Sequence, residues 1–248
     1  MQRPLWISHR GLCEGLTENT AEAFRKAREA GFSHLETDLR MTKDGHIVFS
    51  HDKDLRRLTG QAIVLSRETK ATLQDIRFPD GSGLLFWEGW EALSDKTAWT
   101  FDLKAEDAPA VIDFLAGWME SNGKEDFIRH RVRFVCWSKA HEEQLRQRIP
   151  FACCYARRFE CYRAGIACLV GATGLAGLRR DRVYALPPRL AGIPLFRKPI
   201  LDRYHRRGAK VVAFLPPAGK DSRNAVELGC DEILTNHRPV PPDKAEAQ

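Results

Sequence analysis

The sequence predicts an α/β protein folded as a (β/α)8 TIM-type barrel with a short insertion after the second strand. Eight short runs of β-branched or aromatic residues are bounded by turn residues, and helical patterns lie between most of them. The length of 248 residues is also usual for one such barrel. Strands that alternate with helices favour a parallel sheet, and eight such units favour a closed barrel. The predicted strands span residues 5–8, 34–39, 98–103, 132–137, 151–155, 182–186, 210–215 and 231–235.

Helices are predicted in the intervals between these strands. The sequence from Asn19 to Glu22 resembles a capping box, with Asn19 as the N-cap residue of a helix that Gly31 ends. Further helices are expected over residues 107–122, 140–148, 199–207 and 222–228.

Two segments interrupt the alternation of strands and helices. After a turn signal at residues 43–45, residues 47–49 predict an extra short strand in place of a helix. Residues 53–97 form an irregular stretch, which we interpret as an insertion at the barrel mouth; its Trp87 and Trp90 are expected either to pack or to form an apolar lid. We expect a single domain over residues 1–238 and a flexible tail over residues 239–248.

Composition narrows the class of protein. Hydrophobic residues make up 43% and charged residues 29% of the chain, which is ordinary for a soluble protein with a packed core. No apolar run approaches the ~18 residues of a membrane span, and the N-terminus lacks a signal-peptide pattern, so we expect a cytoplasmic protein. Seven cysteines without a C-x-x-C pair argue against a disulfide framework and a thiolate zinc site.

The net charge of +6 comes from clusters of basic residues. Such clusters suit an anionic small molecule, anionic lipid or nucleic acid, although a solvated surface is their more frequent explanation. We expect a small anionic phosphodiester as the partner, no nucleic acid, and at most peripheral contact with lipid. The amino-acid sequence does not indicate an oligomeric state.

Candidate catalytic residues lie where predicted strands end. His9 follows the first strand, and His51 follows the extra strand that returns the chain to the same rim. Glu36 and Asp38 are two residues apart on the second strand, so their side chains share one face of the sheet. Two carboxylates directed at one point repel each other unless a cation or proton lies between them, and Mg²⁺ and Ca²⁺ prefer oxygen ligands.

Asp102 and Lys104 repeat this alternate spacing on the third strand. Asp102 can complete the carboxylate cluster, while Lys104 and Arg10 offer cations to a phosphoryl group. Two imidazoles can exchange protons with the nucleophile and the leaving alcohol. Together with a metal ion, these residues provide the groups that phosphodiester cleavage requires. Each residue alone has a plainer explanation, such as packing or an ion pair at the end of the barrel. Their joint occurrence favours the functional interpretation.

This set of residues resembles the glycerophosphodiester phosphodiesterase family. The resemblance is strongest over residues 5–60 and returns at residues 208–212 and 229–236. It rests on ordered motifs, which are His9-Arg10-Gly11, Glu18-Asn19-Thr20, Glu36-x-Asp38, Thr42-Lys43-Asp44-Gly45, His51-Asp52 and Asp102-x-Lys104.

The resemblance implies a TIM barrel whose divalent ion, Mg²⁺ or Ca²⁺, is held by Glu36, Asp38 and Asp102. It also implies that His9 and His51 act as the catalytic acid and base. The implied products are sn-glycerol 3-phosphate and an alcohol, with attack by the neighbouring glycerol hydroxyl and a cyclic phosphate on the way.

The sequence differs from the family pattern at two positions of the expected site. Asp102 stands where Glu is usual and is one methylene shorter. On the seventh strand, Phe214 keeps the aromatic wall of a substrate site, but the polar residues that usually follow it are absent. Recognition of the alcohol is therefore the part of the function that the resemblance specifies least.

Alternative functions stay open at this point. A lysophospholipase D-like activity would use the same residues and an apolar path for an acyl chain. A non-catalytic barrel that binds phosphodiesters is disfavoured, because both histidines and all three carboxylates are present. Residues 171–177, after a strand-like run at 166–170, imitate a dinucleotide-binding glycine loop, but no long helix follows them, so we reject nucleotide binding.

Overall fold

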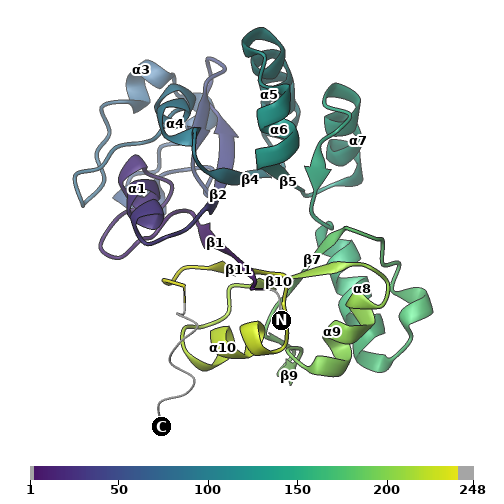
Figure 1. The fold of residues 1–248 in the computed structure, drawn as a ribbon. Coiled ribbons are helices and arrows are strands. Elements are labelled where there is room, and N and C mark those ends of the chain that lie inside the picture. The colour runs from purple at the N-terminus through teal and green to yellow at the C-terminus, as the bar shows by residue number, and fades with distance from the viewer. Residues whose placement is uncertain (1–2, 240–248) are drawn as a thin grey trace.

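Eight parallel strands form a nearly closed barrel in the computed structural model, which describes residues 3–239 (Figure 1). The strands are hydrogen-bonded in the order β6, β5, β4, β2, β1, β11, β10 and β7. Each predicted strand segment overlaps one of them, so the predicted TIM-type barrel is confirmed. Their bounds are β1 (Leu5–His9), β2 (His34–Met41), β4 (Ala98–Leu103), β5 (Val132–Cys136), β6 (Cys153–Cys154), β7 (Val183–Leu186), β10 (Lys210–Phe214) and β11 (Glu232–Thr235).

Helices cover the outside of this sheet (Figure 1). The predicted helix after the first strand begins one residue later than expected, because Thr20 is its N-cap: the Thr20 hydroxyl accepts from the Ala23 amide at 3.2 Å. Residues 166–170 are helical, so the strand-like interpretation of this run was wrong. The outer helices are α1 (Ala21–Glu29), α4 (Trp87–Ser94), α5 (Ala108–Asn122), α6 (Glu125–Arg131), α7 (Lys139–Arg148), α8 (Arg158–Val170), α9 (Lys198–His205) and α10 (Lys220–Glu227).

Alternate residues of each strand face the inside and the outside of the barrel. Inward-facing apolar residues such as Ile7, Val212 and Leu234 pack together inside it. Outward-facing residues such as Trp99 and Phe101 pack against the surrounding helices. The next inward positions toward the carboxyl ends carry polar side chains, which places them at the barrel mouth.

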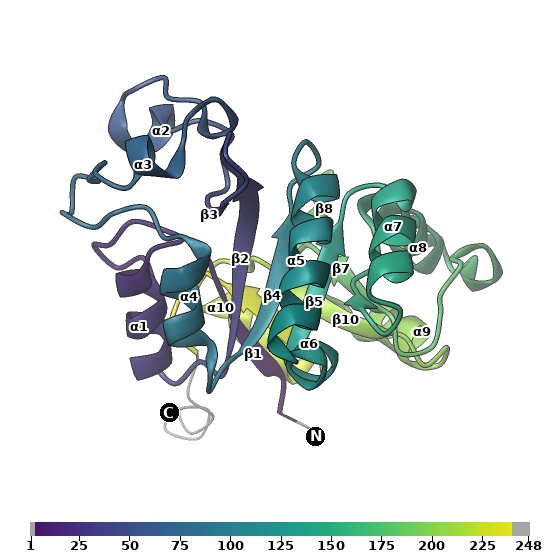
Figure 2. The same cartoon turned by 90° about the horizontal axis from the view of Figure 1, so that it is seen from above.

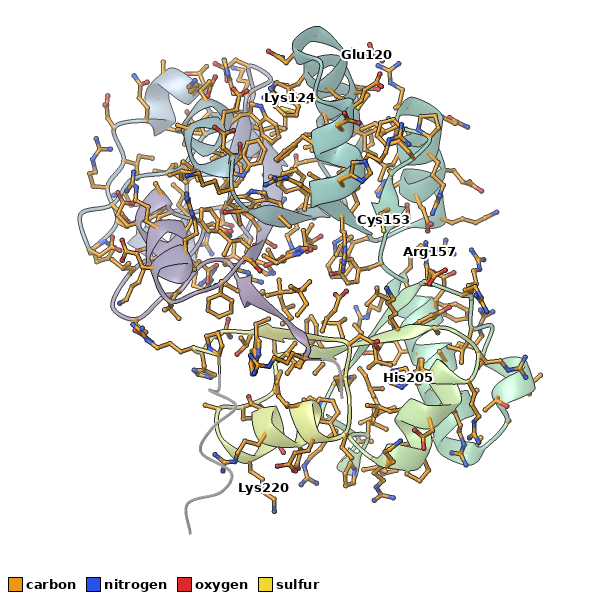
Figure 3. The ribbon with its side chains drawn as sticks, in the orientation of Figure 1. Glu120, Lys124, Cys153, Arg157, His205 and Lys220 are labelled. Atoms are coloured by element: carbon orange, nitrogen blue, oxygen red, sulfur yellow. The ribbon has the colours of Figure 1, made fainter. Side chains whose placement is uncertain are left out.

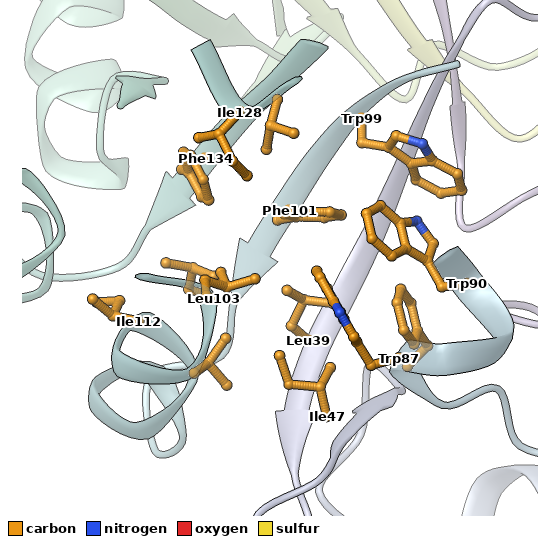
Figure 4. Close-up of a cluster of buried hydrophobic side chains, with 14 of the residues drawn as sticks. Leu39, Ile47, Trp87, Trp90, Trp99, Phe101, Leu103, Ile112, Ile128 and Phe134 are labelled. Carbon is orange, nitrogen blue, oxygen red and sulfur yellow. The ribbon is translucent and has the colours of Figure 1, made fainter. Parts of the chain in front are cut away.

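The outer core contains a dense aromatic cluster (Figure 4). The rings of Trp87 and Trp90 on α4 lie 4.2 Å apart between centroids, and Trp90 also packs edge-on against Phe101 and Trp99 of β4. Both tryptophans are buried. Of the two expectations for these residues, packing is therefore confirmed and the apolar lid is wrong: they attach α4 to the sheet.

The segment after β2 extends beyond the carboxyl ends of the strands (Figure 2). β3 (Ile47–Phe49) pairs antiparallel with β2, as the predicted extra strand requires. After it, the chain forms α2 (Arg56–Thr59), the 3-10 turn η1 (Leu65–Arg67) and α3 (Lys70–Leu73), which enclose a small apolar core of their own. A short hairpin of β8 (Arg189–Leu190) and β9 (Ile193–Pro194) and the 3-10 turn η2 (Thr173–Leu175) complete the described elements. Within residues 3–239, no helix has the length and apolar character needed to cross a membrane.

β6 and β7 are the two ends of the strand order, and no strand ladder joins them. One backbone hydrogen bond spans this seam, from the Ala156 amide to the Val183 carbonyl at 2.8 Å. Buried ion pairs reinforce it: the Arg182 guanidinium donates to both Glu142 oxygens at 2.7 and 2.9 Å and to Glu160 at 3.0 Å. These residues connect α7, α8 and the start of β7, and Arg157 lies at the same seam (Figure 3).

We expect Arg182→Met to lower the free energy of unfolding by about 3 kcal/mol, because it leaves buried Glu142 without its bidentate partner and removes one of the arginines that pair with Glu160. Arg146→Met is the matched control. Arg146 also pairs with Glu142, at 3.3 Å, but it is half-exposed, so its loss should cost less than about 1 kcal/mol. Denaturant unfolding followed by circular dichroism measures both values; equal losses in the two variants would contradict a stabilising role for the seam cluster.

Candidate active site

Three buried carboxylates meet at the mouth of the barrel. Glu36 and Asp38 lie on β2, and Asp102 on β4 is the register partner of Asp38. One oxygen from each of the three residues lies within 4.8 Å of the others. Alternate residues of a strand face the same side of the sheet, so Glu36 and Asp38 face inward together, and the register places Asp102 beside them.

The electrostatics of the cluster fit a bound cation. Burial, together with the charges of Asp38 and Asp102, raises the pKa of Glu36 well above its ordinary value. Burial also raises the pKa of Asp102. Glu36 Oε2 is buried and has no hydrogen-bond partner among residues 3–239. An unpartnered oxygen beside two further carboxylates matches the oxygen-rich ligand set that Mg²⁺ and Ca²⁺ prefer, so the residues present fit a divalent ion.

Two cationic side chains border the cluster. The Lys104 ammonium lies 2.7 Å from Asp38 and 2.6 Å from Asp102, and Arg10 Nε lies 3.0 Å from Asp38. Although burial alone would raise the pKa of Asp38, the charges of Lys104 and Arg10 hold it below its ordinary value. Asp38 is therefore the carboxylate that stays ionised, while Glu36 depends most on an added cation.

Neutral side chains fix the same carboxylates from other directions. The Asn19 amide donates to Asp38 at 2.9 Å, and Asn19 in turn accepts from the Thr37 hydroxyl at 2.8 Å. The Trp137 indole donates to Asp102 at 2.6 Å. Asn19 was predicted to cap a helix; its backbone has a left-handed φ of 58° instead, which turns its side chain toward the site.

His9 lies at the end of β1, beside the cluster. Its Nε2 is 3.9 Å from Glu36, and its Nδ1 is 2.7 Å from the side-chain oxygen of Asn236, just beyond β11. If that oxygen accepts, Nδ1 carries the proton and Nε2 keeps a lone pair directed toward the cluster. Burial, and then the charge of Arg10, lowers the pKa of His9 to about 4, so the imidazole is neutral at neutral pH.

His51 follows β3 directly after Ser50, whose amide donates to the Asp38 carbonyl of β2 at 3.1 Å. The His51 Nδ1 is 2.8 Å from Asp52, which accepts from Arg57 Nε at 2.5 Å. Arg57 also donates to Glu18 at 2.5 Å, and Glu18 pairs with Arg10 at 3.2 Å. A continuous series of alternating charges therefore runs from His51 to the arginine that contacts the carboxylate cluster.

A pocket of about 700 Å³ opens beside His51. Lys104 and Trp137, which both contact Asp102, line it together with His51, so two side chains connect the carboxylate cluster to the pocket beside His51. Arg40 on β2 lines it too and donates to the His51 carbonyl at 2.9 and 3.1 Å. This arginine holds the His51 backbone in place against β2.

Phe214 is the one predicted site residue that stands apart. It lies at the carboxyl end of β10 and is partly exposed. In the strand order β10 is separated from β4 by β2, β1 and β11, which places Phe214 across the mouth from Asp102. The other predicted residues, His9, Arg10, Glu36, Asp38, His51, Asp102 and Lys104, border the cluster or its neighbouring pocket.

We expect Arg57→Gln to lower kcat by about 10–100-fold with a smaller change in KM, because Asp52 would no longer hold the His51 ring in one orientation. Arg56→Gln is the control: Arg56 is adjacent and exposed, and its guanidinium forms no ion pair within residues 3–239. Steady-state kinetics compare the two variants. Equal effects would show that charge at the mouth matters, rather than the position of His51.

Comparisons with known proteins agree with this geometry. The profile of the "Glycerophosphoryl diester phosphodiesterase family" matches residues 9–136. The glycerophosphodiester phosphodiesterase of Caldanaerobacter subterraneus subsp. tengcongensis is 39% identical over 87 residues, which cover 35% of this chain and 34% of that protein. Lysophospholipase D GDPD1 of Homo sapiens is 45% identical over 60 residues, which cover 24% of this chain and 19% of the relative. The matched part of the chain thus spans about a third or less of these relatives.

Solved structures match over nearly the whole chain. A crystal structure of the glycerophosphoryl diester phosphodiesterase domain of an uncharacterized protein from Mycobacterium tuberculosis has a TM-score of 0.77 at 16% sequence identity. That match covers 96% of this chain and 97% of the other. At this identity the similarity establishes the fold.

Proposed function

Because the chain belongs to the glycerophosphoryl diester phosphodiesterase family, we propose that it hydrolyses glycerophosphodiesters to sn-glycerol 3-phosphate and an alcohol, with a divalent metal ion as cofactor. The observation that carries the proposal is the convergence of three buried carboxylates and two imidazoles on one barrel mouth. Cations beside them suit an anionic phosphodiester.

Glu36, Asp38 and Asp102 would hold the ion, either Mg²⁺ or Ca²⁺. When bound, it supplies a Lewis acid for the phosphoryl oxygens. Arg10 and Lys104 already contact Asp38, so their charges lie next to the place where a phosphoryl group would bind. Phe214 would form an apolar wall across the mouth from them.

The two histidines suit opposite proton transfers. With Asn236 accepting from Nδ1, the neutral His9 ring would present an unprotonated Nε2 to the cluster, so it would take the proton from the attacking hydroxyl. His51 has the Asp52 carboxylate at its Nδ1, which orients the ring, so its Nε2 would give a proton to the leaving alcohol. The carboxylate of Asp52 and the side chain of Asn236 would fix the two tautomers.

A panel assay tests this function. Glycerophosphocholine, glycerophosphoethanolamine and glycerophosphoglycerol are incubated with the chain and Mg²⁺, Ca²⁺ or a chelator, and glycerol phosphate is measured enzymatically. Release that needs a divalent ion supports the proposal. Phosphodiester binding without any release would instead favour a non-catalytic barrel.

A lysophospholipase D-like activity is the second candidate. Partly exposed Trp137 and Phe214 give the mouth two apolar walls, and one relative carries that activity in its name. Comparing lysophosphatidylcholine with glycerophosphocholine at equal concentrations separates the two functions. A higher kcat/KM for the lysophospholipid would assign the second one.

A further inference from the structure

Helix α8 presents an apolar stripe to solvent. Among the described residues, eight large hydrophobic side chains are exposed, and five of them lie on α8 and the adjoining η2. They are Phe159 (75% exposed), Tyr162 (45%), Ile166 (51%), Val170 (70%) and Leu175 (76%), hereafter the α8 stripe. Exposed apolar side chains are ordinary when scattered, whereas a contiguous group marks an interaction surface.

The spacing of the residues places them on one helix face. Phe159, Tyr162, Ile166 and Val170 follow one another at intervals of three or four residues, which keeps them within one side of an α-helix. The opposite face of α8 is buried through small residues, among them Ala164, Ala167 and Cys168. The helix is thus apolar on both faces, and only the inner face is covered by the rest of the described chain.

The charge around the stripe is positive. Exposed Arg158 and Arg163 stand next to it on the same helix, and the Arg158 guanidinium lies 5.6 Å from the Tyr162 ring centroid. From residue 157 to residue 180 the only acidic residue is Glu160, which is buried and paired with Arg182. Exposed Arg179 and Arg180 follow η2.

We propose that the α8 stripe is a docking surface for an anionic lipid membrane, independent of the hydrolytic activity proposed above. An apolar helix face with basic side chains beside it is the pattern by which a helix lies in the plane of a membrane interface. The arginines pair with anionic headgroups while the apolar side chains enter the boundary with the acyl chains. Packing against a second copy of α8 would place like charges together, because the one acidic side chain of this segment, Glu160, is buried.

Vesicle co-sedimentation tests this surface without any enzyme assay. The full chain is mixed with sucrose-loaded vesicles of phosphatidylcholine alone or of equal parts phosphatidylcholine and phosphatidylglycerol. We expect it to pellet with the anionic vesicles, more weakly at high salt, and not with phosphatidylcholine alone. Absence of the wild-type chain from the anionic pellet would overturn the proposal.

Two pairs of variants locate the contact. Phe159→Ser with Val170→Ser should lower the partition coefficient at least about tenfold, since it removes two large apolar groups from the interface. Ile193→Ser, which alters an exposed hydrophobic residue on β9, should leave binding unchanged. For charge, Arg158→Gln with Arg163→Gln should weaken binding, whereas Lys220→Gln with Arg223→Gln on α10 should not (Figure 3).

Two results would contradict the assignment. The first is an equal loss of binding in the control variants, which would mean that the vesicles bind elsewhere. The second is a wild-type dimer in light scattering that Phe159→Ser with Val170→Ser converts to a monomer, which would assign the stripe to a second copy of the chain.

Discussion

Replacing His51 with Asn is expected to lower kcat by about 10²–10⁴-fold while leaving the fold intact, because general acid catalysis contributes an effect of that size. The same loss is expected for His9→Asn, because the asparagine amide cannot take a proton as the imidazole Nε2 would. Single-turnover measurements with glycerophosphocholine would report the chemical step directly. Neither side chain is part of the apolar clusters of the core, so unfolding curves should match those of the parent chain.

His46→Asn provides the matched control for both variants. His46 lies at the turn between β2 and β3 and pairs loosely with exposed carboxylates, so its loss should not change kcat. Near-parental turnover in either site variant would remove that histidine from the proposed proton transfers.

Replacing Glu36 with Gln is expected to lower the affinity for Mg²⁺ by at least about 100-fold, since even residues behind the ligands contribute about 10–100-fold in metal sites. Turnover should fall in parallel. Calorimetric titration measures the affinity without reference to activity. Because the pKa of Glu36 is raised by burial and by two neighbouring carboxylates, the Gln variant should be at least as stable as the parent in the absence of metal.

Glu106→Gln is the control for the Glu36 variant. Glu106 lines the pocket beside His51 but lies outside the cluster of three carboxylates. Its replacement should leave Mg²⁺ affinity unchanged. Unaltered affinity in Glu36→Gln would show that the ion binds through other groups.

The sequence predicts the strands and the centre of the site for the same reason. Glu36 and Asp38 interrupt an apolar strand at alternate positions, and Asp102 and Lys104 do so on the next strand of the barrel. A strand period of two then specifies which side chains face one another, once the strands are known to be parallel neighbours. The carboxylate cluster therefore needs no long-range information beyond the fold class.

The long-range contacts around the histidines could not be found in this way. Asn236 reaches His9 from the far end of the chain, and Arg57 reaches Glu18 across an irregular segment. No local periodicity relates such residues, because the contact depends on how loops meet at the mouth. Asn19 was assigned to a helix cap, since Asn is common at caps and at left-handed turns alike.

Helix α8 was overlooked for a different physical reason. A surface helix is recognised in a sequence by apolar residues at intervals of three or four, with polar residues on the opposite face. In α8 the outer face carries Phe159, Ile166 and Val170, while the inner face carries small residues such as Ala164 and Cys168. The usual contrast is missing, so residues 166–170 resembled a strand.

The unpaired seam between β6 and β7 gives the barrel a preferred line of local opening. Amide protons of residues 153–156 and 183–186 should exchange with deuterated solvent sooner than those of β2 and β4, whose ladders are bonded on both sides. Chain breaks should also be tolerated best there, since each half buries an outer core of its own. Fragments ending and beginning near residue 157 are accordingly the natural pair for reassembling this barrel from two separately expressed polypeptides.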